Sequence, residues 1–541
     1  MAGMTRDLAP LQADSFDLLV VGGGIHGLFT AYDAAARGLR VALVERGDVG
    51  GGISFNHQRT IHGGLRALQS GQIRKCREQI RERRAWARIA PHLLRPLPFL
   101  IGTYRGTHRA RLVIRTGFRL YDFIGRSRNV DVLPELHLPN GRLESAAATR
   151  RLFPGVHEPG LSGGAIWYDY QTVHPDRLTY LVALAAHRAG ATLATYVEAI
   201  APRRDGTRLT GATVRDVITG ASFDITARAV VLAAGSGLPA LHERFGVTGA
   251  PPLVRAMNLL LDRPARDIAL AAPSASGRMF TAVPWRGLVL VGTYQPDGAV
   301  HEGVREPLDP FVDAFLAEIL TAFPALGATR DDIRFVHHAL VPAQATPRGL
   351  DLLAEPEILA HAEAPGLISL VGVKYTTARL AAERAVDGAA RHLHVPAVRS
   401  RTATTLLPHA DVADSDGILV ETARTLRVTL DGDVHRHLAG WYGTEASAVL
   451  RCAHASGALA RVSADSPVIE GEAIYAVREA AAVRLDDVVF RRTPLGSAGD
   501  PGDDAIARLA GIMARECGWT DARRVEEISL VRERVIGYGT R

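Results

Sequence analysis

The first fifty residues combine two short apolar runs with a glycine cluster and a helical pattern between them. The run Leu18–Val21 predicts a buried strand, and the run Leu39–Val44 predicts a second one. Between them the apolar positions predict a helix that continues to about Arg37 and is closed by Gly38. Strand, helix and strand in this order form a βαβ unit, so the pattern predicts an α/β fold with a parallel sheet.

The glycines of this unit have the spacing of a dinucleotide-binding turn. Gly22, Gly24 and Gly27 follow the first strand as Gly-x-Gly-x-x-Gly. Gly22 allows the tight turn, Gly24 lets the backbone approach a pyrophosphate, and Gly27 lets helix and strand pack closely. The helix amides then face the phosphates, and Glu45, at the end of the second strand, can hold ribose hydroxyls. This ordered combination predicts a bound dinucleotide.

Two later segments return to the same sheet. Ala227–Gly237 is an apolar strand that ends in small residues, and Gly366–Leu393 combines a strand, a glycine turn and an amphipathic helix. Both lie far beyond the reach of a normal crossover, so other domains must be inserted between them and the first unit. This topology is typical of FAD-binding, Rossmann-like domains of the glutathione-reductase type.

The same patterns divide the chain into five segments. Apolar runs separated by turns predict a β-rich substrate domain inserted before the last part of the FAD domain, and helical patterns dominate the end of the chain. The expected segments are the first part of the FAD domain at 16–90, a mixed region of FAD-domain returns and inserted helices at 91–250, the β-rich domain at 251–347, the last part of the FAD domain at 348–398, and a C-terminal helical domain at 399–541.

One inserted segment, Arg109–Ile124, predicts a basic amphipathic helix in which arginines alternate with large apolar residues. Such a helix usually packs one face on the protein core. The same composition also suits a helix that lies on an anionic membrane. Core packing is the first interpretation here, and a membrane surface is the alternative.

Composition changes this picture only modestly. The 541 residues, 47% of them hydrophobic and 22% charged, are typical of a soluble protein with more than one domain. The net charge of +6 is carried almost entirely by arginine, because Lys75 and Lys374 are the two lysines of the sequence. A basic excess fits anionic substrates, nucleic acid or anionic lipid, and the sequence carries no nucleic-acid-binding module.

The cysteines and the N-terminus indicate the cellular compartment of the protein. Cys76, Cys452 and Cys517 are far apart and odd in number, which predicts neither a disulfide framework nor a metal site and suits a reducing cytoplasm. The N-terminus lacks the apolar core of a secretion signal, and no stretch approaches the roughly 20 apolar residues of a membrane span. We therefore expect a cytoplasmic protein without metal or nucleic-acid partner.

Several motifs together resemble the FAD-dependent (aerobic-type) glycerol-3-phosphate dehydrogenases, from Asp17 to about Gly518. They are VVGGGIHG, IHGGLRALQ, RTGFRLYDFIGR, AVPW, LVGT, VGVKYTTAR and, at 478–493, REAAAVRLDDVVFRRT. The resemblance implies FAD as cofactor and hydride transfer from a secondary alcohol to the flavin. It also implies onward transfer of the electrons to a quinone, with oxygen as the alternative electron acceptor. A peripheral position on the inner face of a membrane is implied as well. A homodimer is left open.

Carried over position by position, the resemblance assigns four residues to the reaction. Arg66, in HGGLR, is aimed at the substrate phosphate, and Lys374, in GVKYTT, lies near substrate and flavin. Arg348 matches a second arginine of the family, in a stretch where the alignment is loose. His62 either contacts the flavin or caps a turn. The residues expected to bind the cofactor are Gly22, Gly24, Gly27, Glu45, Gly63, Gly64, Val197, Ala234, Gly235, Gly372, Lys374, Tyr375 and Thr376.

Four positions depart from the family pattern. Val341 stands where the family has a phosphate-binding arginine, and Asn258 stands where it has a histidine that could act as base. Gln295 replaces a carboxylate, and Ala67 replaces an aromatic residue, which opens space. Each lost charge-assisted contact should cost about 1.5–3 kcal/mol in phosphate binding.

These departures leave the function open between alternatives. The chain is either a glycerol-3-phosphate dehydrogenase with a redrawn pocket or a repurposed relative that oxidises a different, sugar-like or biosynthetic alcohol or amine. A flavin-binding protein without catalytic activity is a further alternative, and Arg66 and Lys374 argue against it.

Overall fold

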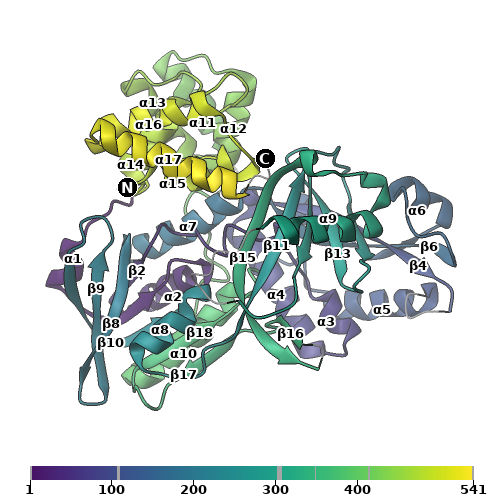
Figure 1. The fold of residues 1–541 in the computed structure, drawn as a ribbon, viewed down its shortest axis with the longest axis horizontal. Coiled ribbons are helices and arrows are strands. Elements are labelled where there is room, and N and C mark those ends of the chain that lie inside the picture. The colour runs from purple at the N-terminus through teal and green to yellow at the C-terminus, as the bar shows by residue number, and fades with distance from the viewer. Residues whose placement is uncertain (1–2, 107–109, 301–307, 348, 412–414, 539–541) are drawn as a thin grey trace.

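The predicted βαβ unit lies at the centre of the first of two large sheets (Figure 1). In this computed structural model, strand β1 (Ser15–Val21) leads into helix α2 (Ile25–Ala36), which returns to strand β2 (Val41–Glu45). The two strands pair in parallel, with Leu18 opposite Val41. The structure describes residues 3–106, 110–300, 308–347, 349–411 and 415–538.

The first sheet has eight strands in the order β17-β18-β10-β1-β2-β7, with β9 and β8 added beyond β10. Both predicted returns join the sheet on the same side of β1, because β10 (Ser222–Leu232) pairs in parallel with β1, and β18 (Leu367–Val371) pairs in parallel with β10. The other strands are β7 (Thr192–Thr195), β8 (Val197–Asp205), β9 (Arg208–Asp216) and β17 (Glu357–Ala360). The expected Rossmann-like parallel sheet is therefore confirmed.

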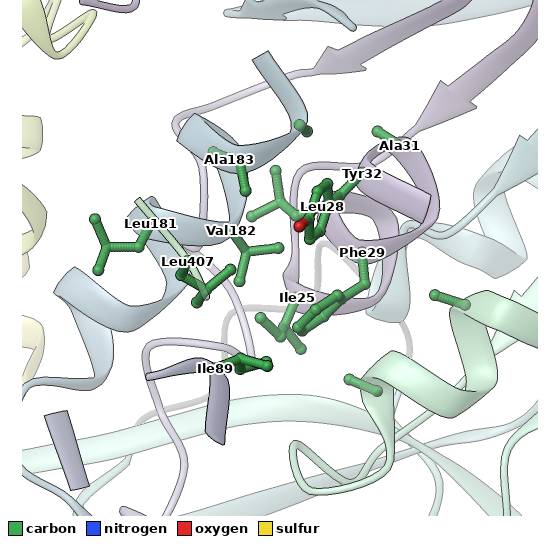
Figure 2. Packing of buried hydrophobic residues seen from close by; sticks show 14 of the residues in the cluster. Ile25, Leu28, Phe29, Ala31, Tyr32, Ile89, Leu181, Val182, Ala183 and Leu407 are labelled. Atoms are coloured by element: carbon green, nitrogen blue, oxygen red, sulfur yellow. The ribbon is translucent and has the colours of Figure 1, made fainter. Parts of the chain in front are cut away.

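Three helices cover one face of this sheet, namely α2, α7 (Pro175–Arg188) and α10 (Ala378–Leu393). Figure 2 shows Leu28 of α2 beside Val182 of α7 in the shared core. Full burial of one such side chain contributes about 1.5–3 kcal/mol. Helix α8 (Leu238–Phe245) and the β8-β9 hairpin contribute apolar side chains to the core on the other side. The sheet is thus buried on both faces, which explains why its strands are continuously apolar.

The second sheet has ten strands in the order β16-β15-β11-β14-β13-β12-β4-β6-β3, with β5 paired to β6. Helix α9 (Asp309–Ala322) packs on it. Its strands are β3 (Thr60–Ile61), β4 (Leu94–Tyr104), β5 (Arg142–Glu144), β6 (Leu161–Thr172), β11 (Leu253–Leu261), β12 (Ala269–Pro273), β13 (Met279–Trp285), β14 (Leu288–Tyr294), β15 (Ile333–Thr346) and β16 (Gly349–Leu352).

The composition of this sheet corrects one expected boundary. The sequence places the β-rich domain at 251–347 alone, but β4 pairs in parallel with β12, and β6 and β3 extend the sheet from there. Without these strands β12 would be an edge with unpaired backbone groups, so the earlier segment completes the sheet. The domain is therefore built from two separate stretches of chain.

The end of the chain forms the expected helical domain, drawn in yellow and light green in Figure 1. Its apolar side chains share one cluster with Phe55, with Trp285 of β13 and with Phe335 of β15, so the domain packs directly on the second sheet. Its helices are α11 (Ser415–Leu426), α12 (Gly432–Tyr442), α13 (Ala446–Ala455), α14 (Glu470–Glu479), α15 (Leu485–Asp487), α16 (Asp503–Cys517) and α17 (Asp521–Tyr538).

The first insertion contributes three helices, of which the first and third lie away from the C-terminal domain (Figure 1) and the second reaches the main core through Trp86 and Ile89. They are α3 (Leu65–Gln69), α4 (Ile73–Ile89) and α5 (Arg111–Ile124). Arg109, where the predicted basic helix begins, lies outside the described residues. Within the described part of the chain, no helix is both long and apolar enough to cross a bilayer.

Candidate FAD and substrate site

A cavity of about 590 Å³ lies where β1 and β2 end and extends to the C-terminal domain. This volume is within the range of cofactor pockets, about 300–1,000 Å³, and ligands of open parallel sheets bind at the carboxyl ends of the strands. Eight residues expected to bind the cofactor line the cavity. These are Gly22, Gly24, Glu45, Val197, Ala234, Gly235, Gly372 and Tyr375.

The glycines of the first turn are required by close contacts. Gly22 has a φ of +114°, and a Cβ there would lie 2.6 Å from the Ala233 carbonyl oxygen. At Gly27 a Cβ would lie 1.9 Å from the carbonyl oxygen of Gly22, so Gly27 serves packing and does not line the cavity. A Cβ at Gly24 would meet only Ser54 Oγ, at 3.5 Å, so a larger side chain there would extend along the cavity wall.

Glu45 is held firmly at the end of β2. Its carboxylate accepts hydrogen bonds from the backbone amides of Gly23, at 2.5 Å, and Gly47, at 2.8 Å. Burial raises the pKa of Glu45 despite these two donors. The carboxylate therefore fixes the glycine turn relative to the following loop and faces the cavity, where a ribose would be held.

Two histidines that sequence reasoning missed lie in the cavity wall. His57 stacks on Tyr375 with ring centroids 4.5 Å apart, and a Cβ at Gly372 would lie 2.3 Å from His26 Nε2. Burial lowers the pKa of His26 to about 4 and that of His57 well below its ordinary value, so both rings are neutral. Among the described residues neither Nε2 atom has a hydrogen-bond partner. Such buried polar atoms beside a cavity fit a polar ring system as ligand.

The predicted residues of the HGG loop lie outside the cavity wall. Gly63 packs against α4 and α5, because a Cβ there would lie 2.1 Å from Arg83 Nη1 and 2.2 Å from the Tyr121 hydroxyl. Gly64 has a φ of +81° and begins α3. Thr376 accepts a hydrogen bond from the His62 backbone amide, at 3.0 Å. These residues shape the loop beside the cavity, and their role as cofactor residues stays a prediction.

Asp169 holds this loop from β6. It accepts hydrogen bonds from the Gly63 amide, at 2.7 Å, and from Arg83, at 2.5 Å, and its other oxygen lies 3.3 Å from His62 Nδ1. Burial raises the pKa of Asp169, but the hydrogen bond from His62 and the charge of Arg83 outweigh burial and hold it below its ordinary value. The His62 side chain itself is 51% exposed.

Lys374 lies at the side of the cavity, between two residues that line it, Val373 and Tyr375. Its Nζ donates a hydrogen bond to the Ala354 carbonyl oxygen, at 2.8 Å. Burial and then the nearby charges of Lys75 and Arg66 lower the pKa of Lys374 to about 8. The structure thus brings the predicted pair Arg66 and Lys374 together, whereas Arg348 lies outside the described residues.

The four departures from the family pattern have separate surroundings. Val341 is buried in an apolar cluster with Val254 and Ala256 that continues to Ile53 and Val373 in the cavity wall. Ala67 is also buried, in a cluster with Cys76, Ile80 and Tyr121. Its small side chain is therefore enclosed by packing, which corrects the expectation that it opens space.

Asn258 and Gln295 are buried and fully engaged. The Asn258 side chain accepts a hydrogen bond from Thr293, at 3.0 Å, and donates one to the Asn56 carbonyl, at 3.3 Å. Gln295 accepts from Arg278 and donates to the Leu350 carbonyl, both at 3.0 Å. Neither side chain lines the cavity or offers a basic atom to a substrate.

The C-terminal domain forms part of the cavity wall, which sequence reasoning missed. Asp48, in the loop after β2, accepts hydrogen bonds from Arg491 Nε at 2.5 Å and from two nitrogens of Arg492 at 2.8 Å. Burial raises the pKa of Asp48, but the two arginines outweigh it and hold the pKa below its ordinary value. The wall residues from this domain are Arg484, Asp486, Arg491, Glu527, Leu530 and Arg534.

The site therefore fits FAD by its volume, its glycine turn and its unpartnered buried nitrogens. Glu45 would hold a ribose, and His26, His57 and Tyr375 would border the ring system. Within the described part of the chain, no group of three or more histidine, cysteine or acidic residues is arranged to hold a metal ion.

Comparison with known proteins decides the family. Residues 17–387 match the family model described as FAD dependent oxidoreductase, and residues 400–524 match the one described as C-terminal domain of alpha-glycerophosphate oxidase. A glycerol-3-phosphate dehydrogenase of Synechocystis sp. is 30% identical over 554 residues, covering 98% of both chains. The chain belongs to the FAD-dependent glycerol-3-phosphate dehydrogenase family.

Other members of this family support the assignment. Glycerol-3-phosphate dehydrogenase 2 of Mycobacterium tuberculosis is 30% identical and covers 97% of this chain and 89% of its own length. The solved structure of the glycerol-3-phosphate dehydrogenase from Bacillus halodurans complexed with FAD shares the fold, with a TM-score of 0.75 and 24% identity, covering 98% of this chain and 96% of that chain. The chain is thus an FAD-dependent oxidoreductase that acts on CH–OH groups, as the resemblance implies.

Proposed function

We propose that this family member oxidises a hydroxyl compound that is larger or less charged than glycerol 3-phosphate. The observation that carries the proposal is the apolar cluster around Val341, which reaches the cavity wall through Ile53 and Val373. An apolar wall cannot replace a charge-assisted contact to phosphate, whose loss costs about 1.5–3 kcal/mol. Asn258 and Gln295 add no compensating charge, because both are neutral and already hydrogen-bonded.

The residues of the site have separate roles in this proposal. Gly22, Gly24 and Glu45 bind the dinucleotide, and His57, which stacks on Tyr375, contacts the ring system. The bound flavin supplies the hydride acceptor. Lys374 places positive charge beside the cavity, where its ammonium attracts and orients an anionic group of the substrate.

Arg66 and His62 hold the substrate side of the site in the same proposal. Arg66 is exposed and forms no ion pair with any described residue, so its guanidinium is available to an anionic group. His62 is oriented by Asp169 and exposes half of its side chain.

The family resemblance extends the proposal in two ways. The electrons pass onward to a quinone, with oxygen as the alternative acceptor, and the protein assembles as a homodimer.

Anaerobic bleaching of the flavin tests the substrate proposal. Purified holoenzyme is mixed with glycerol 3-phosphate and with a panel of larger phosphorylated and free polyols, and the rate of flavin reduction is recorded. We expect glycerol 3-phosphate to give a kcat/KM below the usual enzyme range of about 10⁴ M⁻¹s⁻¹ and a larger polyol to exceed it. Efficient reduction by glycerol 3-phosphate would restore the ordinary family substrate, and bleaching by no compound would favour a non-catalytic flavoprotein.

We also propose a peripheral position on an anionic membrane surface at the cytoplasmic face. Helix α5 buries Phe118 and Tyr121 against the protein, while Leu112 and Phe123 are 74% and 63% exposed on the opposite face. Exposed arginines flank them, among them Arg119. An outward apolar face with basic borders favours the membrane interpretation over simple core packing.

A further inference from the structure

The two lysines of the chain, Lys75 and Lys374, contact neighbouring residues of one turn. Lys75 stands in the first turn of α4, and its Nζ lies 3.3 Å from Glu355 Oε1. Lys374 stands 299 positions later in the sequence, and its Nζ donates to the carbonyl oxygen of Ala354, at 2.8 Å. Both ammonium groups therefore rest on consecutive residues of one turn, between β16 and β17.

Arg66 adds a third cation to this place. Arg66 lies beside Lys75, because its neighbour Ala67 packs with Cys76, the neighbour of Lys75, in one apolar cluster. The charges of Arg66 and Lys75, after burial, lower the pKa of Lys374. The helix behind Lys75 adds further positive potential, because α4 begins without a side-chain cap and without an acidic residue in its first turn. Arg66, Lys75 and Lys374 are called the cationic cluster below.

A plain surface ion pair does not account for this arrangement. Lys75 is 14% exposed, so its amine is largely withdrawn from water, and Glu355 is 51% exposed and free to turn away. One half-exposed carboxylate does not balance three cations and a helix N-terminus, and like charges at close range repel. Such a cluster is stabilised by an anion that carries more than one charge.

We propose that the cationic cluster binds the phosphate group of the substrate and that Glu355 occupies the place of this phosphate until substrate displaces it. Lys75 is the residue that this proposal adds to the site. The proposal rests on the proposed function and deepens it, since it makes the substrate a phosphorylated polyol. It also explains how an anionic substrate is held after the loss of a cation at Val341, because the cation is supplied from α4.

The position of the cluster suits this role. Lys374 lies between Val373 and Tyr375, which both line the flavin cavity, so a phosphate bound by its amine remains at the cavity edge. The hydroxyl-bearing carbon can then extend past the apolar wall toward the ring system. In this proposal, a substrate longer than glycerol 3-phosphate reaches from the cationic cluster to the ring system of the flavin.

Isothermal titration calorimetry of the holoenzyme with inorganic phosphate tests the cluster without turnover. Lys75→Met should weaken phosphate binding about ten- to a hundredfold, as expected for loss of one charge-assisted contact. Arg77→Met, which removes an exposed cation from the same turn region of α4, should leave binding within about twofold of the parent. Glu355→Gln should tighten binding, because the competing carboxylate is gone.

Amine labelling gives a second measurement on the unaltered protein. Because the chain has two lysines, labelled peptides report on Lys75 and Lys374 alone, apart from the N-terminus. We expect inorganic phosphate to slow the labelling of both lysines together. The proposal is overturned if the parent shows no saturable phosphate binding, if Lys75→Met binds as the parent does, or if phosphate protects neither lysine.

The outcomes also separate this inference from the proposed function. Phosphate binding that depends on Lys75, without flavin reduction by any polyol, supports the cluster and contradicts the proposed oxidation. Flavin reduction by a larger polyol with the same KM in the parent and in Lys75→Met supports the oxidation and contradicts the cluster. A KM raised at least tenfold in Lys75→Met, with little change in kcat, supports both.

Discussion

The three glycines of the turn, Gly22, Gly24 and Gly27, have different roles, although the motif contains all three. Gly22 and Gly27 are excluded from substitution by backbone contacts, whereas Gly24 faces the cavity with space around it. The sequence predicts all three as cofactor residues. The contacts show that Gly27 serves packing alone, whereas Gly22 both makes the tight turn and lines the cavity, and Gly24 lines the cavity with space around it.

Replacement of Gly24 by Leu should therefore yield a folded protein without flavin, because the side chain would take the place of the pyrophosphate. The flavin absorbance per chain after purification measures this, with circular dichroism to verify the fold. Gly440→Ala is the matched control, since a Cβ there meets nothing within 4 Å. A Gly24→Leu protein that keeps its full flavin would contradict the placement of the dinucleotide.

Lys374 is expected to give the reaction a pH limit. Burial and the cations Lys75 and Arg66 lower its pKa from 10.5 to about 8, while Glu355 opposes them. The amine is thus charged below pH 8 and neutral above it, so flavin reduction that needs the ammonium should decline as pH rises through about 8. Anaerobic stopped-flow rates between pH 6 and pH 10 measure this decline.

Variants at this position separate charge from shape. Lys374→Met should reduce flavin slowly and without this pH limb, and Lys374→Arg should impair reduction more than flavin binding, because a planar guanidinium does not replace a compact ammonium. A parent rate that is flat across pH 8 would show that the charge of Lys374 does not limit the reaction.

At the scale of elements, α5 makes the membrane proposal testable. At low salt the protein should sediment with anionic vesicles, and high salt should release it, because each arginine near such a surface contributes about 1 kcal/mol. Phe123→Ser should weaken this association. Val525→Ser, which alters a side chain 60% exposed on the C-terminal domain, is the control. Absence of binding at low salt would exclude this surface.

The sequence predicts those elements whose signals are local. The βαβ unit, its two returns and the β-rich segment 251–347, in which β11, β13, β14 and β15 lie, follow from apolar runs and turns within a few residues. The pairing of β12 with β4 could not be predicted, because it joins segments 170 residues apart and leaves no local pattern. Gly63 shows the same limit within the site, since the sequence cannot tell a glycine that faces a ligand from one that faces Arg83.

At the scale of the molecule, the C-terminal domain is joined to the FAD domain by buried charge. Asp48 is paired with Arg491 and Arg492, and a second buried pair links Arg177 of α7 to Glu445. The sequence shows these arginines within a family motif but gives no sign that they reach a loop more than 440 residues earlier. The cavity wall that they complete is therefore visible only in the folded chain.

Arg492→Met should lower the free energy of unfolding by about 3–5 kcal/mol, because it leaves Asp48 buried with one partner fewer. It should also lower the flavin content, since Asp48 lies in the cavity wall. Denaturant titration and flavin absorbance measure the two effects. Arg478→Met, which breaks the exposed pair with Glu516, should cost at most about 1 kcal/mol and leave the flavin bound. Equal effects of both changes would contradict a special role for Asp48.

The wall residue Arg534 lies in α17, 489 residues after Glu45 at the end of β2. Domains fold during synthesis from the N-terminus onward, so the βαβ unit can form long before α17 leaves the ribosome. A nascent chain that lacks α17 therefore presents an incomplete cavity wall, so firm capture of the cofactor follows the synthesis of α17. A chain truncated before α17 should accordingly be colourless after purification.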